Sequence, residues 1–225
     1  MLIQNICGLK YPDEFIIRFF FKERLLDKKG SVLELGCGNG SNLSLFYQYG
    51  WSIIGVDISE EMIAQGNKNI LNYHNNNFEN KFRFICDDMI EFVDETNEKY
   101  DALILAGSLY YLEYSKIIQL FSLVKDKDLL NSGSMVYFNI RLLNDYRYAK
   151  GIQIGTNSFR LTINETGEEN CIMTFFSEEE FINLISQYFD FKDMKVMHSL
   201  YDNYDSKNEK IIPMNSDLIV WGKVK

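Results

Sequence analysis

The residues best suited to chemistry lie in one short segment, residues 34–40, with the sequence Glu-Leu-Gly-Cys-Gly-Asn-Gly. Glycines accept a positive φ angle and let the backbone approach a ligand closely. The helix that we expect just after them, at about residues 41–49, offers free backbone N–H groups in its first turn. The segment therefore predicts a ligand-binding turn between a strand and a helix. The pattern alone also fits a tight turn that binds nothing.

Carboxylates stand at three places around this turn that suit a charged nucleoside. Glu34, two residues before the first glycine, favours a ligand that carries an ammonium group. Asp57 ends the next expected strand, where a carboxylate can accept hydrogen bonds from both hydroxyls of a ribose. Asp87 and Asp88 close the third expected strand. Either could accept a hydrogen bond from an adenine amino group, with Met89 against the ring.

A parallel sheet must bring these positions together. Apolar runs alternate with segments of helical spacing through residues 31–140, which predicts a doubly wound α/β fold with right-handed crossovers. Ligands bind at the carboxyl ends of the strands in such sheets, so we expect the site there. The expected strands are residues 31–35, 52–56, 82–86, 101–106 and 133–140, and the expected helices are residues 41–49, the stretch that Ser59 caps, and residues 114–124.

Two segments outside this alternation predict additions to the sheet. Residues 13–29 carry apolar side chains at helical spacing and predict an N-terminal helix. Residues 152–176 alternate polar and apolar side chains, which predicts two or three inserted antiparallel strands.

The C-terminal part predicts a helix followed by a hairpin. Ser177 opens a capping box for a helix at residues 178–187. Residues 192–200 and 217–223 predict a terminal antiparallel hairpin, and residues 201–210 read as a charged loop.

Taken in order, these motifs resemble those of the class I S-adenosylmethionine-dependent methyltransferases, and the resemblance covers residues 31–140. It implies a Rossmann-like, mostly parallel seven-stranded sheet with a reversed last strand. It also implies S-adenosylmethionine as the cofactor and S-adenosylhomocysteine as the product. The matching segments are residues 32–40 (motif I), 57–62 (second motif), 88–92 (adenine-side motif), 101–109 (fourth strand) and 133–139 (fifth strand).

The same resemblance assigns cofactor-binding roles. It implies that Glu34 orients the amino end of the cofactor, that Asp57 holds the ribose, and that Asp88 or Asp87 holds the adenine amino group. We interpret Cys37 as a spacer in the turn and not as a nucleophile. The other residues expected at the cofactor site are Gly36, Gly38, Asn39, Ile58, Met62, Met89, Ala106, Gly107 and Ser108.

Methyl transfer from a sulfonium is an in-line displacement, which needs alignment, and a general base only when the acceptor arrives protonated. The catalytic, acceptor-side candidates follow the fourth and fifth strands and are Tyr110, Tyr111 and Arg141. The tyrosines could instead pack in the core, and Arg141 could instead form a surface salt bridge. Weaker candidates in or beside the insertion are Tyr146, Arg147 and Arg160.

The N-terminal residues 11–19 resemble the opening of methyltransferases from bacterial surface-polysaccharide clusters, some of which serve the O-methyl phosphoramidate decoration of capsules. In those proteins a leading helix closes over the cofactor. The resemblance implies that Tyr11 and Arg18 approach the methionine end and that the acceptor is an anionic phosphoryl oxygen. The alternative is a packed amphipathic helix with a solvated Arg18. We interpret residues 1–225 as one methyltransferase domain, with residues 1–30 as a helical cap and residues 142–176 over the acceptor pocket.

The composition of the chain disfavours several classes of binding partner. A net charge of −9 without a basic stripe disfavours nucleic acid. No apolar run approaches the ~20 residues of a membrane helix and no signal peptide is recognisable, so we expect no membrane association and a cytoplasmic location. Four cysteines and two histidines, His74 and His198, lack the spacing of a metal site.

The expected reaction is methyl transfer to oxygen or nitrogen of a small-molecule, nucleotide-linked or sugar-linked acceptor, with a capsule phosphoramidate as one candidate. The alternatives are N-methylation of an unrelated metabolite and a non-catalytic partner that binds the cofactor. A dinucleotide-binding oxidoreductase is disfavoured, because Ser41 stands where its glycine motif needs Gly or Ala. The sequence sets no oligomeric state.

Overall fold

The computed structural model describes residues 5–73, 81–163, 167–204, 207 and 209–225. Five strands of its main sheet are parallel, as expected, and they lie in the order β3-β2-β1-β4-β5. The central strands are apolar almost throughout because helices cover both of their faces. The bounds are Ser31–Leu35 (β1), Ser52–Asp57 (β2), Phe82–Cys86 (β3), Tyr100–Ala106 (β4) and Leu130–Leu142 (β5).

Two antiparallel strands complete the main sheet. β10 (Lys210–Val224) pairs antiparallel with β5, and β9 (Phe191–Tyr204) pairs antiparallel with β10. The main sheet therefore runs β3-β2-β1-β4-β5-β10-β9, which confirms the expected α/β architecture, with a terminal hairpin whose last strand is reversed.

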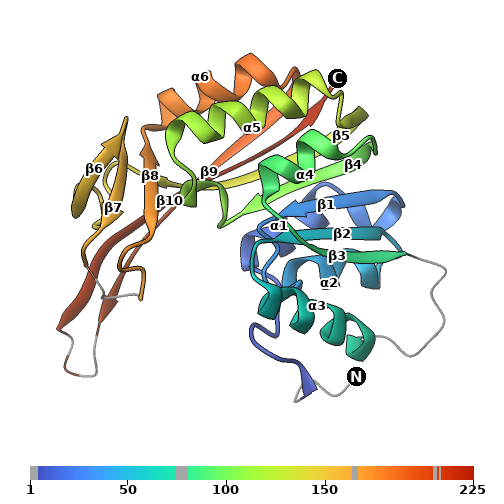
Figure 1. The fold of residues 1–225 in the computed structure, drawn as a ribbon, viewed down its shortest axis with the longest axis horizontal. Helices are drawn as coiled ribbons and strands as arrows, with labels where there is room; N and C mark the ends of the chain where they lie inside the picture. Colours follow the sequence, from blue (N-terminus) through green and yellow to red (C-terminus); the bar gives the residue numbers. More distant parts are fainter. Residues whose placement is uncertain (1–4, 74–80, 164–166, 205–206, 208) are drawn as a thin grey trace.

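Helices cover both faces of the main sheet (Figure 1). Phe121 and Phe138 belong to the core on one face, and Phe19 and Trp51 belong to the core on the other. No helix in the described ranges is long and apolar enough to cross a membrane. The first face carries α4 (Met89–Glu95), α5 (Tyr114–Asp126) and α6 (Glu178–Tyr188), and the second carries α1 (Glu14–Lys22), α2 (Ser41–Gln48) and α3 (Glu60–Tyr73).

The N-terminal helix is shorter than the predicted residues 13–29. Asp13 caps α1 by accepting a hydrogen bond from the second residue of the helix. The helix ends because Arg24 adopts a left-handed conformation with φ 52°, which α-helical hydrogen bonding does not allow. A short 3-10 helix, η2 (Leu25–Asp27), follows. The ring of Phe19 contacts rings of β5 and β10, so α1 packs on that part of the sheet.

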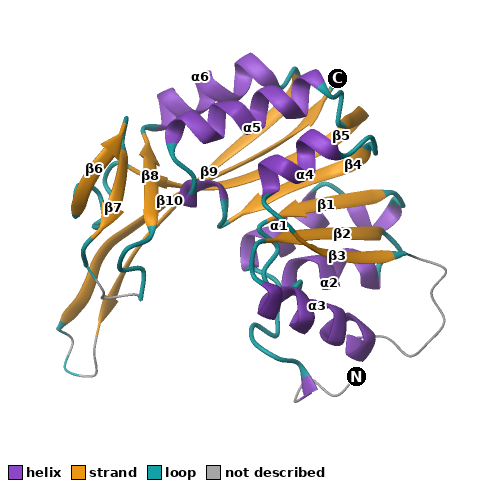
Figure 2. Ribbon diagram, viewed as in Figure 1, coloured by secondary structure: helices purple, strands orange, loops and turns teal. Residues whose placement is uncertain are grey.

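Three antiparallel strands form a small inserted sheet, as the alternating pattern predicts (Figure 2). They are β6 (Gly151–Gly155), β7 (Ser158–Leu161) and β8 (Ile172–Phe176). β8 also pairs in parallel with the carboxyl end of β5, at Arg141 and Leu142. The inserted sheet is therefore attached at the edge of the main sheet where the expected site lies.

The terminal hairpin is longer than the predicted strands. The predicted loop at residues 201–210 is partly strand, because β9 continues to Tyr204 and β10 begins at Lys210. Residues 205, 206 and 208 of that loop lie outside the described residues. β5 accompanies β10 only from Asp217 onward. Before Asp217, β10 therefore pairs as a strand with β9 and not with β5. This part of the hairpin is not recognisable from apolar alternation in the sequence.

Candidate functional site

The glycine-rich turn joins β1 to α2 with three glycines at positive φ, which are Gly36 (76°), Gly38 (52°) and Gly40 (75°). A Cβ atom on Gly36 would lie 2.3 Å from the Cβ of Ser108, so this position is closed to any side chain. A Cβ on Gly38 would meet nothing within 4 Å, because that residue faces open space. The turn therefore brings bare backbone to a cavity.

The cavity has a volume of about 600 Å³ and lies at the carboxyl ends of β1, β2, β3 and β4. It brings together most of the residues predicted for the cofactor site and one of the three acceptor-side candidates. The predicted residues that line it are Gly36, Gly38, Asp57, Ile58, Asp87, Asp88, Met89, Gly107, Ser108 and Tyr111.

Asp57 is fixed in this cavity by two backbone groups. Its Oδ2 atom accepts a hydrogen bond from the N–H of Gly38 (2.8 Å), and its Oδ1 atom accepts one from the N–H of Ser59 (2.9 Å). A carboxylate oxygen accepts more than one hydrogen bond, so both oxygens keep capacity for a ligand hydroxyl. Ser59 also begins α3 as predicted, because its Oγ atom accepts a hydrogen bond from the N–H of Met62.

The two consecutive aspartates after β3 occupy the next part of the cavity. Asp88 caps α4, with Oδ1 accepting hydrogen bonds from the N–H groups of Ile90 and Glu91. Asp87 Oδ1 accepts a hydrogen bond from the N–H of Asp88. Both carboxylates are thereby oriented by backbone at the end of a strand, and the apolar Ile58 and Met89 line the cavity beside them.

Glu34 lies in the interior at the end of β1, with 1% of its surface exposed. Its Oε1 atom accepts a hydrogen bond from the Asn42 side chain (2.7 Å), and its Oε2 atom has no partner in the described chain. Burial, reinforced by the nearby charges of Asp57 and Asp13, raises the pKa of this carboxyl from 4.5 to about 8, although the hydrogen bond from Asn42 opposes the shift. An unpartnered buried oxygen of this kind is suited to a cationic group.

Four other residues predicted for the cofactor site do not line the cavity and lie behind or beside it. Cys37 is buried, and burial raises the pKa of its thiol, which keeps it protonated and agrees with a spacer. Asn39 is buried and donates to the carbonyl oxygens of Cys7 and Leu9, so it holds the N-terminal segment against the turn. Met62 is half-buried on α3, and Ala106 packs against the core.

Tyr11 and Arg18 do not line the cavity, in contrast to the implied approach to the methionine end. Tyr11 is 64% exposed. Arg18 is also exposed, pairs with Glu14 one helical turn away (3.6 Å), and lies over the ring of Phe15. The reason is that the apolar face of α1 packs on β5 and β10, which turns Arg18 toward solvent. The alternative of a packed amphipathic helix describes this segment.

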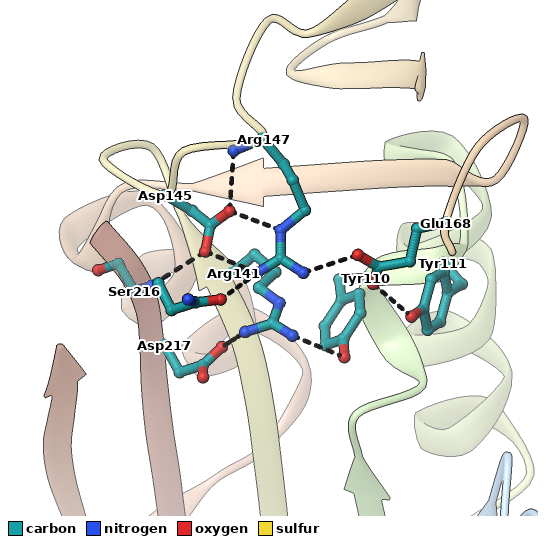
Figure 3. A network of polar contacts seen from close by, with 9 residues as sticks. Tyr110, Tyr111, Arg141, Asp145, Arg147, Glu168, Ser216 and Asp217 are labelled. Atoms are coloured by element: carbon teal, nitrogen blue, oxygen red, sulfur yellow. Dashed lines mark hydrogen bonds and ion pairs between the residues drawn. The ribbon is translucent and has the colours of Figure 1, made fainter. Parts of the chain in front are cut away.

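The acceptor-side candidates divide between the cavity and the network beside it (Figure 3). Tyr111, in the 3-10 helix η3 (Leu109–Tyr111), lines the cavity and donates a hydrogen bond from Oη to Glu168 (2.9 Å). Tyr110 is buried, with the Arg141 guanidinium 4.9 Å from its ring centroid. Arg141 forms an ion pair with Asp217 of β10 in the interior and not on the surface. Neither Tyr110 nor Arg141 lines the cavity.

Arg147 is the centre of the adjoining part of this network and is 2% exposed. It donates to both carboxylate oxygens of Asp145, to Glu168 Oε2 (2.8 Å) and to Asn215 Oδ1 (2.9 Å). Figure 3 shows these contacts converging from the segment after β5, from the loop before β8 and from β10. Arg147 therefore has a structural role in joining these parts.

Sequence reasoning missed a group of residues that the inserted sheet brings to the cavity. Arg160 of β7 lines it, although the sequence ranks it only as a weak candidate. The further lining residues that were not predicted are Val56, Leu112, Asn170, Cys171 and Ile172. The only available signal was the placement of an insertion over the pocket, since none of these residues belongs to a motif. Of the two histidines, His74 lies outside the described residues, and His198 contacts Glu178 on the surface (2.7 Å).

Known proteins share parts of this sequence. Residues 32–126, less than half of the chain, match the family model described as a methyltransferase domain. The polyamine aminopropyltransferase of Saccharolobus solfataricus is 37% identical over 95 residues, which are 38% of this chain and 32% of that protein. The chain thus matches only about a third of the length of this curated relative.

Solved structures share the fold across nearly the whole chain. An S-adenosylmethionine-dependent methyltransferase from Methanosarcina mazei has a TM-score of 0.64 and 18% identity, covering 91% of this chain and 97% of its own. Magnesium protoporphyrin IX methyltransferase from Synechocystis, solved with bound S-adenosylmethionine, has a TM-score of 0.58 and 14% identity, covering 94% and 77%. The fold is therefore the Rossmann-like fold of S-adenosylmethionine-dependent methyltransferases.

Proposed function

We propose that the protein transfers a methyl group from S-adenosylmethionine to a small acceptor, because residues 32–126 match a methyltransferase domain and the chain has the fold of S-adenosylmethionine-dependent methyltransferases. One observation carries the proposal. The Asp57 carboxylate is fixed by the N–H of Gly38, at the point where the glycine turn faces open space. This arrangement fits a ribose held beside bare backbone.

The residues present fit three parts of the cofactor, which are its amino group, its ribose and its adenine. The unpartnered Oε2 atom of Glu34 suits the amino group, and Asp57 suits the ribose hydroxyls. Asp87 and Asp88 suit the adenine amino group, and Ile58 suits the ring. When bound, S-adenosylmethionine supplies an electrophilic methyl group on a sulfonium. The task of the chain is to hold and align both partners and to exclude water.

The acceptor atom is proposed to be oxygen or nitrogen of a small, nucleotide-linked, sugar-linked or phosphoryl-linked compound, with a capsule phosphoramidate as one candidate. Tyr111 and Ser108 line the cavity after β4 and would contact the acceptor. Burial raises the pKa of Tyr111, so its hydroxyl stays protonated and positions the acceptor rather than removing a proton. An acceptor that is already deprotonated needs no base.

The test of the cofactor assignment is thermal unfolding with S-adenosylhomocysteine, with NADH and NADPH as controls. A ligand at ~100 times its dissociation constant stabilises the native state by about 2.7 kcal/mol, so a clear rise in Tm with S-adenosylhomocysteine alone supports the proposal. A rise with NADH alone, or no rise with any of the three, overturns it.

The match with a polyamine aminopropyltransferase favours a second candidate, transfer of an aminopropyl group. That match is confined to 38% of the chain. Mass analysis of a product distinguishes the two reactions, since the added groups differ in mass. For the location of the protein we propose the cytoplasm, whose reducing conditions suit its four free cysteines.

A further inference from the structure

Charge is distributed unevenly over the cavity. The acidic residues that line it, Asp57, Asp87 and Asp88, lie at the ends of β2 and β3. Among the described lining residues, Arg160 is the only basic one, and it belongs to β7 in the inserted sheet. In the strand order, β3 lies at one end and β7 is next to the other end, with β2, β1, β4, β5 and β8 between them. The cavity therefore has an acidic side and a single cation facing it.

The register of the inserted sheet explains why Arg160 reaches the cavity. Its neighbours Phe159 and Leu161 are buried in the small core, so Arg160 points to the opposite face of β7. It pairs with Ile152 of β6 and with Ile172 of β8 across the sheet. Ile172 lines the cavity as well. The side chains of Ile152, Arg160 and Ile172 therefore lie in one row across the face of the inserted sheet that points away from its small core.

The guanidinium is held by neutral backbone and not by an acid. Arg160 Nη1 donates to the carbonyl oxygen of Asn170 (3.1 Å), which lies in the loop before β8. Glu168 of the same loop accepts hydrogen bonds from Tyr111 and Arg147, which ties the loop to the body of the molecule. Arg160 is therefore bonded to a loop that is itself held in place by Tyr111 and Arg147.

The neighbouring arginines are already neutralised. Arg141 is paired with Asp217, and Arg147 with Asp145 and Glu168. In the part of the chain that the structure describes, no carboxylate lies within ion-pair distance of Arg160. Arg160 is thus the cation at this site whose charge is available to a ligand.

We infer that Arg160 determines acceptor specificity by binding an anionic group, carboxylate or phosphoryl, of an acceptor whose adjoining part is apolar. This inference rests on the proposed function, because the bound molecule is an acceptor only if the protein transfers a methyl group. A guanidinium binds either group through two parallel N–H donors. Ile152 and Ile172 provide apolar contact beside it, and Leu112 lines the cavity on the side of η3. Arg141 and Arg147 position the surrounding network and do not contact the acceptor.

The test is titration calorimetry on protein saturated with S-adenosylhomocysteine, with three probes of one shape class: phenyl phosphate, benzoate and benzyl alcohol. We expect at least one anion to bind about tenfold more tightly than the neutral alcohol, the size of one charge-assisted contact. The two anions distinguish a phosphoryl from a carboxylate preference. Equal affinity for all three probes overturns the inference.

Variants separate Arg160 from general surface charge. Arg160→Gln is expected to abolish the preference for the anion, and Arg160→Lys to keep part of it. Arg24→Gln is the matched control, because Arg24 is an exposed arginine in η2's cap region, remote in sequence and paired with Asp27. A preference that survives Arg160→Gln, or that Arg24→Gln removes equally, contradicts the inference.

The two proposals can fail separately. If S-adenosylhomocysteine does not bind, the proposed function fails, and the same probe titrations on the free protein still decide whether Arg160 binds an anion. If S-adenosylhomocysteine binds and the anion preference is absent, only the inference about Arg160 fails.

Discussion

Asp57 connects the glycine turn, the start of α3 and the cavity through one carboxylate. We predict that Asp57→Ala lowers the affinity for S-adenosylhomocysteine by about 1.5–3 kcal/mol, the usual loss when hydrogen bonds to a charged group are removed. Calorimetric titration measures the change. Asp94→Ala is the matched control, because Asp94 is an exposed aspartate on α4 whose nearest cation is Lys127. Equal affinity of the two variants would remove the ribose assignment.

Glu34 gives the unliganded protein a predictable pH dependence. In the folded protein the pKa of the Glu34 carboxyl is about 8, which exceeds its ordinary value of 4.5 in an unfolded chain. The native state therefore holds the proton more tightly than the unfolded chain does. This contribution to stability is fully present below about pH 4.5 and is lost as the pH rises to about 8. The groups that act on it are Asn42, Asp57 and Asp13.

Denaturant unfolding of the unliganded protein at successive pH values measures this effect. We predict that Glu34→Gln flattens the decline in the free energy of unfolding between about pH 4.5 and 8, because glutamine keeps the shape without titrating. Wild-type and variant profiles that run parallel would show that Glu34 does not titrate in this range.

Among the elements, the loop before β8 is attached to the body of the molecule by one carboxylate, that of Glu168. Glu168 accepts hydrogen bonds from Tyr111 of η3 and from Arg147, and the loop that carries it continues into β8. We predict that Glu168→Ala increases amide hydrogen exchange in residues 168–172, because the loop loses both attachments. Exchange in β1 and β4 is the internal reference. Unaltered exchange in the loop would mean that other contacts hold it.

Local sequence signals identified some elements and missed others, for physical reasons. Ser177 caps α6 as its capping box predicts, because the contact lies within one turn of helix. α4 was not recognised, since seven residues hold too few apolar repeats for a helical period. The one local signal for α4 is Asp88, an aspartate in the capping position before its first residue.

At the scale of the whole molecule, Arg147 joins three segments that are distant in sequence. They are the segment after β5, the loop before β8, and β10. Breaking a buried ion pair leaves an uncompensated charge, which costs about 3–5 kcal/mol. We predict a loss of stability of that size for Arg147→Gln, because Asp145 would remain buried without its cation. Denaturant unfolding measures it. Arg83→Gln, which breaks the exposed pair with Glu98, should change stability by less than about 1 kcal/mol. Similar losses in both variants would contradict the structural role.

Sequence alone was sufficient to place the strand-end residues that line the cavity. Asp57 ends a parallel strand, and Gly36, Gly38 and Asp88 follow one closely. The carboxyl ends of neighbouring parallel strands meet at one edge. Contiguous motifs therefore predict a cavity without knowledge of the distant parts of the chain.

The tertiary structure alone decided which arginine lines the cavity and which arginines pair with carboxylates. Whether an arginine is available to a ligand depends on which carboxylate lies beside it, and Arg141 meets Asp217 across 76 positions of sequence. Arg160 faces the cavity because of the register in which β7 pairs with β8. A shift of one residue in that register would turn its side chain to the opposite face of the sheet. Such long-range pairings leave no local pattern, so the sequence could name these arginines as candidates but ranked Arg141 above Arg160, although only Arg160 lines the cavity.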